Sequence, residues 1–166
     1  YAFAVFKVSG LSSNALLEKV STSLAGGESL SQSEQIAWER VQKRVRTLCE
    51  ATAQAGGRVM IDAEESWIQD AIDELAEDMM SDYNRGRVVV YNTVQLYRHD
   101  RLDYLKNMAS RAEEGGYMCG VKLVRGAYME KERQRASNLG YPSPIQPDKA
   151  SSDRDFDAAL RWVLHR

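Results

Sequence analysis

Apolar residues along this chain fall into short runs that alternate with longer stretches of helical periodicity. The short runs lie at 3–8, 58–62, 87–92 and 120–124, and each contains or ends at a polar side chain. Short apolar runs bounded by turn residues are typical of buried strands, and a period near 3.6 residues is typical of amphipathic helices. Strands that alternate with helices indicate an α/β fold with a parallel sheet.

The longest predicted helix begins at Ser31 and continues to about Gln54. Glu34 lies three residues after Ser31, which is the spacing of a capping box. Apolar residues recur through this stretch with a period close to that of a helix. The predicted apolar face consists of Ile36, Val41, Val45, Leu48 and Cys49.

Further helices are predicted from about Ser66, from an N-cap at Asp100, over residues 129–138 and from an N-cap at Asp153. Residues 11–30 carry a weaker signal for one short helix. The helix from Ser66 has the clearest stripe of apolar residues. That stripe consists of Ile68, Ala71, Ile72, Leu75 and Met79.

The unit of helix, strand and polar strand end recurs about every 30 residues, from Asp62 to Asn92 and from Asn92 to Lys122. This repeat is typical of a TIM-type (βα)8 barrel, which needs about 250 residues to close. The 166 residues of this chain cannot supply eight units, and four parallel strands alone leave two open edges. The sequence therefore predicts a single domain, residues 1–166, with about four parallel strands. It would be the central portion of a barrel whose N- and C-terminal parts are missing.

Composition excludes several classes of function. The chain is 43% hydrophobic and 28% charged with a net charge of −2, so nucleic acid is not an expected partner. No apolar run approaches the roughly 18–20 residues that cross a bilayer. His99 and His165 are isolated, and Cys49 and Cys119 lack metal-type spacing, so no metal site is predicted. The two cysteines are interpreted as reduced core residues of a cytosol-like compartment.

Polar side chains stand at four predicted strand ends, namely Lys7, Asp62, Asn92 and Lys122. A solvated strand terminus is the more common explanation for any single one of them. Because the carboxyl ends of parallel strands meet at one edge, the four are expected to share a cleft. Two cations, an acid and an amide suit an anionic or zwitterionic small molecule and a polar cofactor edge. The acids at 64–65 begin a helix, where the dipole alone favours them.

Several segments resemble the proline dehydrogenase family. They are Ile-Asp-Ala-Glu-Glu at 61–65, Tyr-Asn-Thr-Val-Gln-Leu-Tyr at 91–97, Lys-Leu-Val-Arg-Gly-Ala-Tyr-Met-Glu-Lys-Glu at 122–132 and Gly-Tyr-Pro-Ser-Pro-Ile at 140–145. The resemblance implies a distorted (βα)8 barrel that holds FAD at the carboxyl ends of its strands. It implies oxidation of L-proline to Δ1-pyrroline-5-carboxylate, with a quinone as electron acceptor. It also implies a cytoplasmic enzyme, peripheral to the inner membrane, in a bacterium, or a mitochondrial one in a eukaryote.

The same resemblance implies a role for individual positions. Asp62 and Lys122 would be catalytic, Asp62 by orienting charged groups and Lys122 by stabilising the charge that grows on the isoalloxazine. Lys7 would bind the proline carboxylate. Leu123 and Tyr128 would pack on the pyrrolidine ring. The cofactor-binding residues would be Ala63, Asn92, Gln95, Arg125, Gly126 and Ala127.

Two departures from the family pattern keep other interpretations open. Val94 stands where the family more often has an aromatic residue, and the family's carboxylate-binding arginine pair lies on a late helix that this sequence lacks. One alternative is an inactive barrel fragment that self-associates across its open edges. A less favoured one is an aldolase that forms a Schiff base on Lys122.

Overall fold

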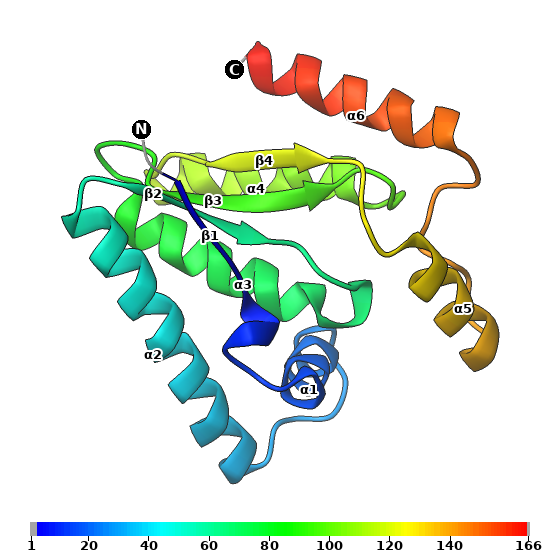
Figure 1. Cartoon of the computed structure of the whole chain (residues 1–166), viewed down its shortest axis with the longest axis horizontal. Helices are drawn as coiled ribbons and strands as arrows, with labels where there is room; N and C mark the ends of the chain where they lie inside the picture. Colours follow the sequence, from blue (N-terminus) through cyan, green and yellow to red (C-terminus); the bar gives the residue numbers. More distant parts are fainter. Residues whose placement is uncertain (1–2, 166) are drawn as a thin grey trace.

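The computed structural model describes residues 3–165 and has an α/β architecture (Figure 1). Its sheet consists of β1 (Phe3–Lys7), β2 (Arg58–Asp62), β3 (Val90–Gln95) and β4 (Val121–Val124). The strands lie side by side in chain order, and all three pairings are parallel. This arrangement confirms the predicted fold class of successive parallel βα units from a barrel. β1 and β4 are the edge strands of the described sheet.

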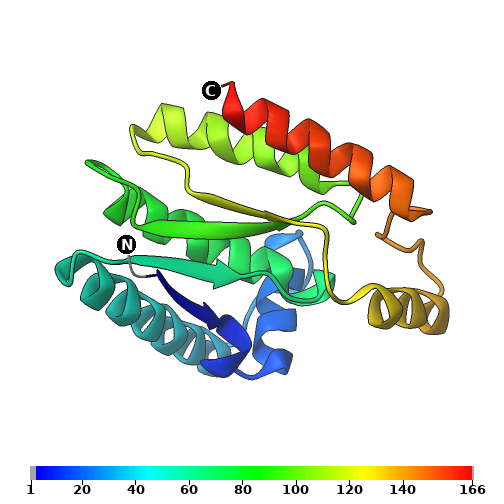
Figure 2. The ribbon, with the colours of Figure 1, turned by 45° about the horizontal axis from the view of Figure 1, so that its top comes forward.

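Helices connect the strands and follow the last one (Figure 2). Between β1 and β2 lie the short 3-10 helix η1 (Val8–Gly10), α1 (Asn14–Leu24) and α2 (Gln32–Gln54). Helix α3 (Ser66–Tyr83) connects β2 to β3, and α4 (Arg101–Gly115) connects β3 to β4. After β4 come α5 (Met129–Leu139) and α6 (Lys149–Leu164). In both views α5 lies beyond the carboxyl ends of the strands, whereas α3 and α4 run alongside the sheet. No helix within residues 3–165 is long and apolar enough to cross a bilayer.

The hydrophobic core lies between the sheet and the helices, with α3 at its centre. The predicted apolar stripe of α3 is confirmed, because every one of its members is buried. Ile61 of β2 and Val90 and Val94 of β3 face this helix layer and are fully buried. The opposite face of the sheet is uncovered near β1, where Val5 is 54% exposed.

Helix α2 confirms its predicted start but corrects its predicted face. Ser31 and Glu34 form the capping box. Ile36 and Leu48 were expected in the core and are instead 44% and 39% exposed, whereas Trp38 is buried. The stripe that faces the core starts at Trp38 and continues at helical spacing to Val41, so positions 36 and 48 point further around the helix.

Two element boundaries also differ from prediction. The third strand covers 90–95 rather than 87–92, so it begins three residues later. Helix α6 begins at Lys149, not beyond Asp153, because Asp148 is its N-cap and accepts a hydrogen bond from Ser151 N at 2.7 Å. An aspartate at the N-cap satisfies an otherwise unpaired amide of the first turn.

Candidate active site

A cleft of about 290 Å³ lies at the carboxyl end of the sheet. The strand register brings one residue of each strand into line there. Lys7 of β1 is paired with Asp62 of β2, and Thr93 of β3 is paired with Lys122 of β4. Ile61 is paired with Asn92, so the next residues along, Asp62 and Thr93, are also neighbours. All four residues of this row line the cleft.

The polar centre of the cleft is one carboxylate between two ammonium groups. Lys122 Nζ lies 2.6 Å from Asp62 Oδ1, and Lys7 Nζ lies 3.2 Å from Asp62 Oδ2. The amine of Lys122 and the carboxylate of Asp62 therefore lie on the same side of the sheet. Two cations face one anion, which leaves an excess of positive charge toward the cleft.

This arrangement changes the pKa of both Asp62 and Lys7. Partial burial alone would raise the pKa of Asp62, but hydrogen bonds and charge from Lys122 and Lys7 outweigh it and lower that pKa. Burial opposes the charge of Lys7, yet the Asp62 carboxylate outweighs this and raises the pKa of Lys7. At neutral pH Asp62 is therefore an anion and Lys7 a cation.

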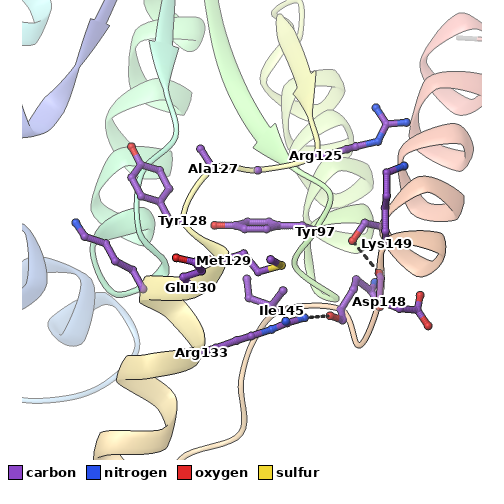
Figure 3. A pocket seen from close by; sticks show the side chains of 14 residues that line it. Tyr97, Arg125, Ala127, Tyr128, Met129, Glu130, Arg133, Ile145, Asp148 and Lys149 are labelled. Atoms are coloured by element: carbon purple, nitrogen blue, oxygen red, sulfur yellow. Dashed lines mark hydrogen bonds between the residues drawn. The ribbon is translucent and has the colours of Figure 1, made fainter.

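The turn after β4 forms another wall of the cleft and contains Arg125, Gly126, Ala127 and Tyr128. Gly126 has a φ of +143°, and a Cβ at this position would lie 2.4 Å from the Tyr97 ring. A side chain at residue 126 is therefore excluded by the protein's own tyrosine as well as by its backbone conformation. Figure 3 shows the Tyr97 ring beneath Ala127.

A second cavity, of about 710 Å³, adjoins the cleft (Figure 3). Residues 125–128 line both spaces, so the turn after β4 separates them. The Arg125 guanidinium points away from Tyr128 in Figure 3. It lies 2.5 Å from Asp153 Oδ1 and 4.4 Å from the centre of the Phe156 ring, both on α6.

Most predicted site residues meet in the cleft. Lys7, Asp62, Lys122 and Tyr128 line it, together with the predicted cofactor residues Ala63, Gln95, Arg125, Gly126 and Ala127. Gln95 is buried, and its side-chain amide donates to Glu64 O at 2.7 Å. The structure thus gathers these positions from β1, β2, β3 and the turn after β4.

Asn92 and Leu123 do not line the cleft, and the expectation that Asn92 shares it with Lys7, Asp62 and Lys122 is wrong. Asn92 is fully buried on the helix side of the sheet, where its Nδ2 lies 2.9 Å from Asp73 Oδ1 and 3.0 Å from Tyr104 Oη. Leu123 packs against the hydrophobic core. Successive residues of a strand point to opposite faces, so Leu123 is turned away from the side on which Lys122 lies.

The sequence interpretation missed Thr93 and Val124, which line the cleft in these strands. The alternation of side chains between the two faces of a strand could have identified both residues. Lys122 faces the cleft, so Val124 two residues later must face it too. In β3 the cleft-facing positions are Thr93 and Gln95, one residue out of step with Asn92.

The acids after Asp62 are held by specific partners and not by the helix dipole alone. The Glu64 carboxylate accepts hydrogen bonds from Ser9 N at 2.9 Å and from Ser9 Oγ. Glu65 Oε1 lies 2.6 Å from Lys131 Nζ on α5. Both glutamates are buried, so these contacts fix the turn that carries Asp62 and Ala63.

The family model described as "Proline dehydrogenase" matches residues 6–166. The chain belongs to the proline dehydrogenase family. Among curated relatives, mitochondrial proline dehydrogenase 1 of Drosophila melanogaster is 37% identical over 75% of this chain and 18% of its own length. The human mitochondrial proline dehydrogenase 1 is 33% identical over 80% of this chain and 22% of its own length. Carbapenem antibiotics biosynthesis protein CarD of Pectobacterium carotovorum subsp. carotovorum is 35% identical over 99% of this chain and 42% of its own length.

Solved structures share the fold. Proline utilization A from Bdellovibrio bacteriovorus superposes with a TM-score of 0.81 at 20% identity and covers 97% of this chain. This chain corresponds to 15% of that protein. It likewise spans less than half the length of each of the curated relatives named above.

Proposed function

We propose that this proline dehydrogenase-family chain forms part of an enzyme that oxidises L-proline to Δ1-pyrroline-5-carboxylate with FAD and passes the electrons to a quinone. The observation that supports this most is the Lys7–Asp62–Lys122 arrangement at the strand ends, with more positive than negative charge. Proline carries a carboxylate, which such a cleft attracts. The chain covers only 18% of the Drosophila melanogaster relative and 15% of proline utilization A, so the proposal is for the parent protein.

The donor set of the cleft fits a flavin. FAD, when bound, supplies the hydride acceptor, and the reduced ring gains negative charge. Lys122 would favour that charge, because a fixed cation stabilises negative charge that develops in the transition state. Gly126 and Ala127 would bring backbone close to the ring system, and the adjoining 710 Å³ cavity adds room beside the 290 Å³ cleft.

Each residue of the ion cluster would have a separate task. Lys7 would bind the substrate carboxylate, and Tyr128 would contact the ring of proline. Asp62 would hold both ammonium groups in place and would not act as the base, because a carboxylate with a lowered pKa accepts a proton poorly at neutral pH. Arg125 would reach a cofactor through its backbone unless its side chain leaves Asp153.

The proposal is tested by adding FAD to the purified chain and to its parent protein, and then adding L-proline without air. A yellow protein that L-proline bleaches, and D-proline does not, supports it. A parent protein that takes up no FAD contradicts it. If the parent binds FAD and this chain does not, light scattering of the chain will show whether it self-associates, as open β1 and β4 edges would allow.

A further inference from the structure

Helix α5 is anchored by a charged residue and has no apolar stripe. Its buried residues are Glu132 and Ala136, and Glu132 is fully buried, with 0% exposure. A surface helix is normally held by apolar residues that recur along one face. A buried carboxylate is costly unless hydrogen bonds satisfy it, so the contacts of Glu132 decide where α5 lies.

The Glu132 carboxylate binds the first residue of α3. Its Oε1 accepts a hydrogen bond from Ser66 N at 2.6 Å, and its Oε2 accepts one from Ser66 Oγ at 2.6 Å. The N-cap of α3 is Glu65, whose side chain makes no capping bond. Glu132 belongs to α5 but serves as a capping residue for α3, and the positive end of the α3 dipole favours its negative charge.

Two neighbouring residues of α5 bind the same turn. Lys131 Nζ lies 2.6 Å from Glu65 Oε1. The Arg135 guanidinium lies 4.4 Å from the centre of the Trp67 ring and also pairs with Glu18 of α1. One turn of α5 thus contacts three consecutive residues, 65–67.

These contacts connect two walls of the cleft that the sheet does not connect directly. Asp62 ends β2 and Ala63 follows it, and Ala127 and Tyr128 precede α5, whereas β3 lies between β2 and β4. Hydrogen bonds of the sheet therefore do not join the two turns to each other. The contact from Glu132 to Ser66 joins the segment after β2 to the helix that follows the second turn.

We propose that Glu132 is a positioning residue that sets the distance between the 62–63 wall and the 126–128 wall, and thereby the fit of the cleft to its cofactor. This rests on the function proposed above in so far as the cofactor is FAD. Glu132 does not line the cleft itself, so it would act through Tyr128 and Ala127.

Three variants separate this role from general stability. Glu132→Ala removes both bonds to Ser66. Glu132→Gln keeps the geometry, because its oxygen can accept from Ser66 N while its NH₂ donates to Ser66 Oγ. Ser66→Ala removes one bond and retains the carboxylate. Glu114→Ala is the matched control, since it removes an exposed acid from α4.

Hydrogen exchange and FAD titration of the chain are measured on all variants. In E132A we expect amides of 129–139 to exchange faster while those of α4 stay protected, and FAD affinity to fall by roughly 10- to 100-fold, as misplaced binding groups do. S66A should show a smaller change in the same direction. E132Q and E114A should stay close to the unsubstituted chain.

The two readouts also separate this proposal from the proposed function. Unchanged exchange of α5 in E132A would overturn the anchoring role, and faster exchange with unchanged FAD affinity would overturn the positioning role. Equal losses of FAD affinity in E132Q and E132A would also contradict the positioning role of Glu132. If the unsubstituted chain takes up no FAD, the FAD affinities of the same variants are compared in the parent protein, whose failure to bind FAD would refute the proposed function; exchange of 126–131 in the chain still decides whether Glu132 fixes that wall.

Discussion

On each side of the sheet lies a carboxylate that is paired with basic side chains, Asp62 of β2 on the cleft side and Asp73 of α3 on the helix side, but their surroundings differ. Asp73, on the helix side, receives four hydrogen bonds, two from Arg101 and one each from Gln69 and Asn92. The side chains of Asp73 and Arg101 are only 7% and 3% exposed. Asp62, on the cleft side, receives two hydrogen bonds, one from each lysine.

This difference distinguishes a structural ion pair from a candidate binding site. The Asp73 pair is largely desolvated, and its carboxylate accepts four hydrogen bonds from protein atoms, so it needs no ligand to balance its charge. The lysines beside Asp62 are 31% and 48% exposed and outnumber the carboxylate. A ligand carboxylate or an electron-rich ring can therefore compensate charge that the protein leaves uncompensated.

The largest expected effect is on the buried pair. Arg101→Met should lower the free energy of unfolding by about 3–5 kcal/mol, because it leaves the Asp73 carboxylate buried without its cation. Urea denaturation measures this, with Lys106→Met on the exposed side of α4 as the control. A loss below about 1 kcal/mol would mean that the Asp73–Arg101 pair behaves like a solvent-exposed ion pair and would contradict its description as a buried one.

A smaller loss is expected for Asn92→Leu. The buried amide bonds Asp73 and Tyr104, so its removal should cost about 1–3 kcal/mol. Because Asn92 faces the helices, the variant should keep the FAD affinity of the folded chain. If Asn92→Leu kept its full stability but bound FAD more weakly, Asn92 would belong to the cleft and not to the buried network around Asp73.

The smallest stability effect concerns Asp62 and depends on pH. Its folded pKa lies below the ordinary value of 3.8, so its contribution is complete above that value and is lost as pH falls through the lowered folded pKa. At this partly exposed site it should amount to at most about 1 kcal/mol. The stability difference between the chain and Asp62→Asn should therefore be constant from pH 7 to about 5 and shrink below about pH 4.

Comparing the chain with Asp62→Asn cancels an opposite pH dependence of stability, which comes from three acids of α3 and is common to both proteins. Partial burial raises the pKa of Asp70, Glu74 and Asp78, and neighbouring acids add to the effect. Their protonation relieves a cost in the folded state as pH falls. A difference that instead grew toward low pH would contradict the lowered pKa of Asp62.

The sequence predicted the architecture because the strong signals are local. The capping box at Ser31 and the stripe of α3 each depend on spacing within one element, and both are confirmed. Lys122 and Asp62 were placed together correctly because a cation in an apolar strand has only one inexpensive direction to point.

The errors arose where one residue of register decides the face. Starting the third strand at Arg87 made Asn92 its last residue, although β3 continues to Gln95 and turns Asn92 toward α3. The expectation for Leu123 came from the family resemblance, and the alternation of β4 turns this residue to the helix side. The partners of Glu64, Glu65 and Glu132 lie between 55 and 66 residues away in the sequence, and no local pattern indicates such contacts.

The most direct test compares FAD binding by Lys122→Met and Asn92→Leu, each expressed per folded molecule. Lys122 faces the cleft and Asn92 the helix layer, so FAD affinity should fall by about tenfold or more in Lys122→Met and stay unchanged in Asn92→Leu. Weaker FAD binding by Asn92→Leu together with unchanged FAD binding by Lys122→Met would place the cofactor on the helix side of the sheet, which would contradict a cofactor site in the cleft.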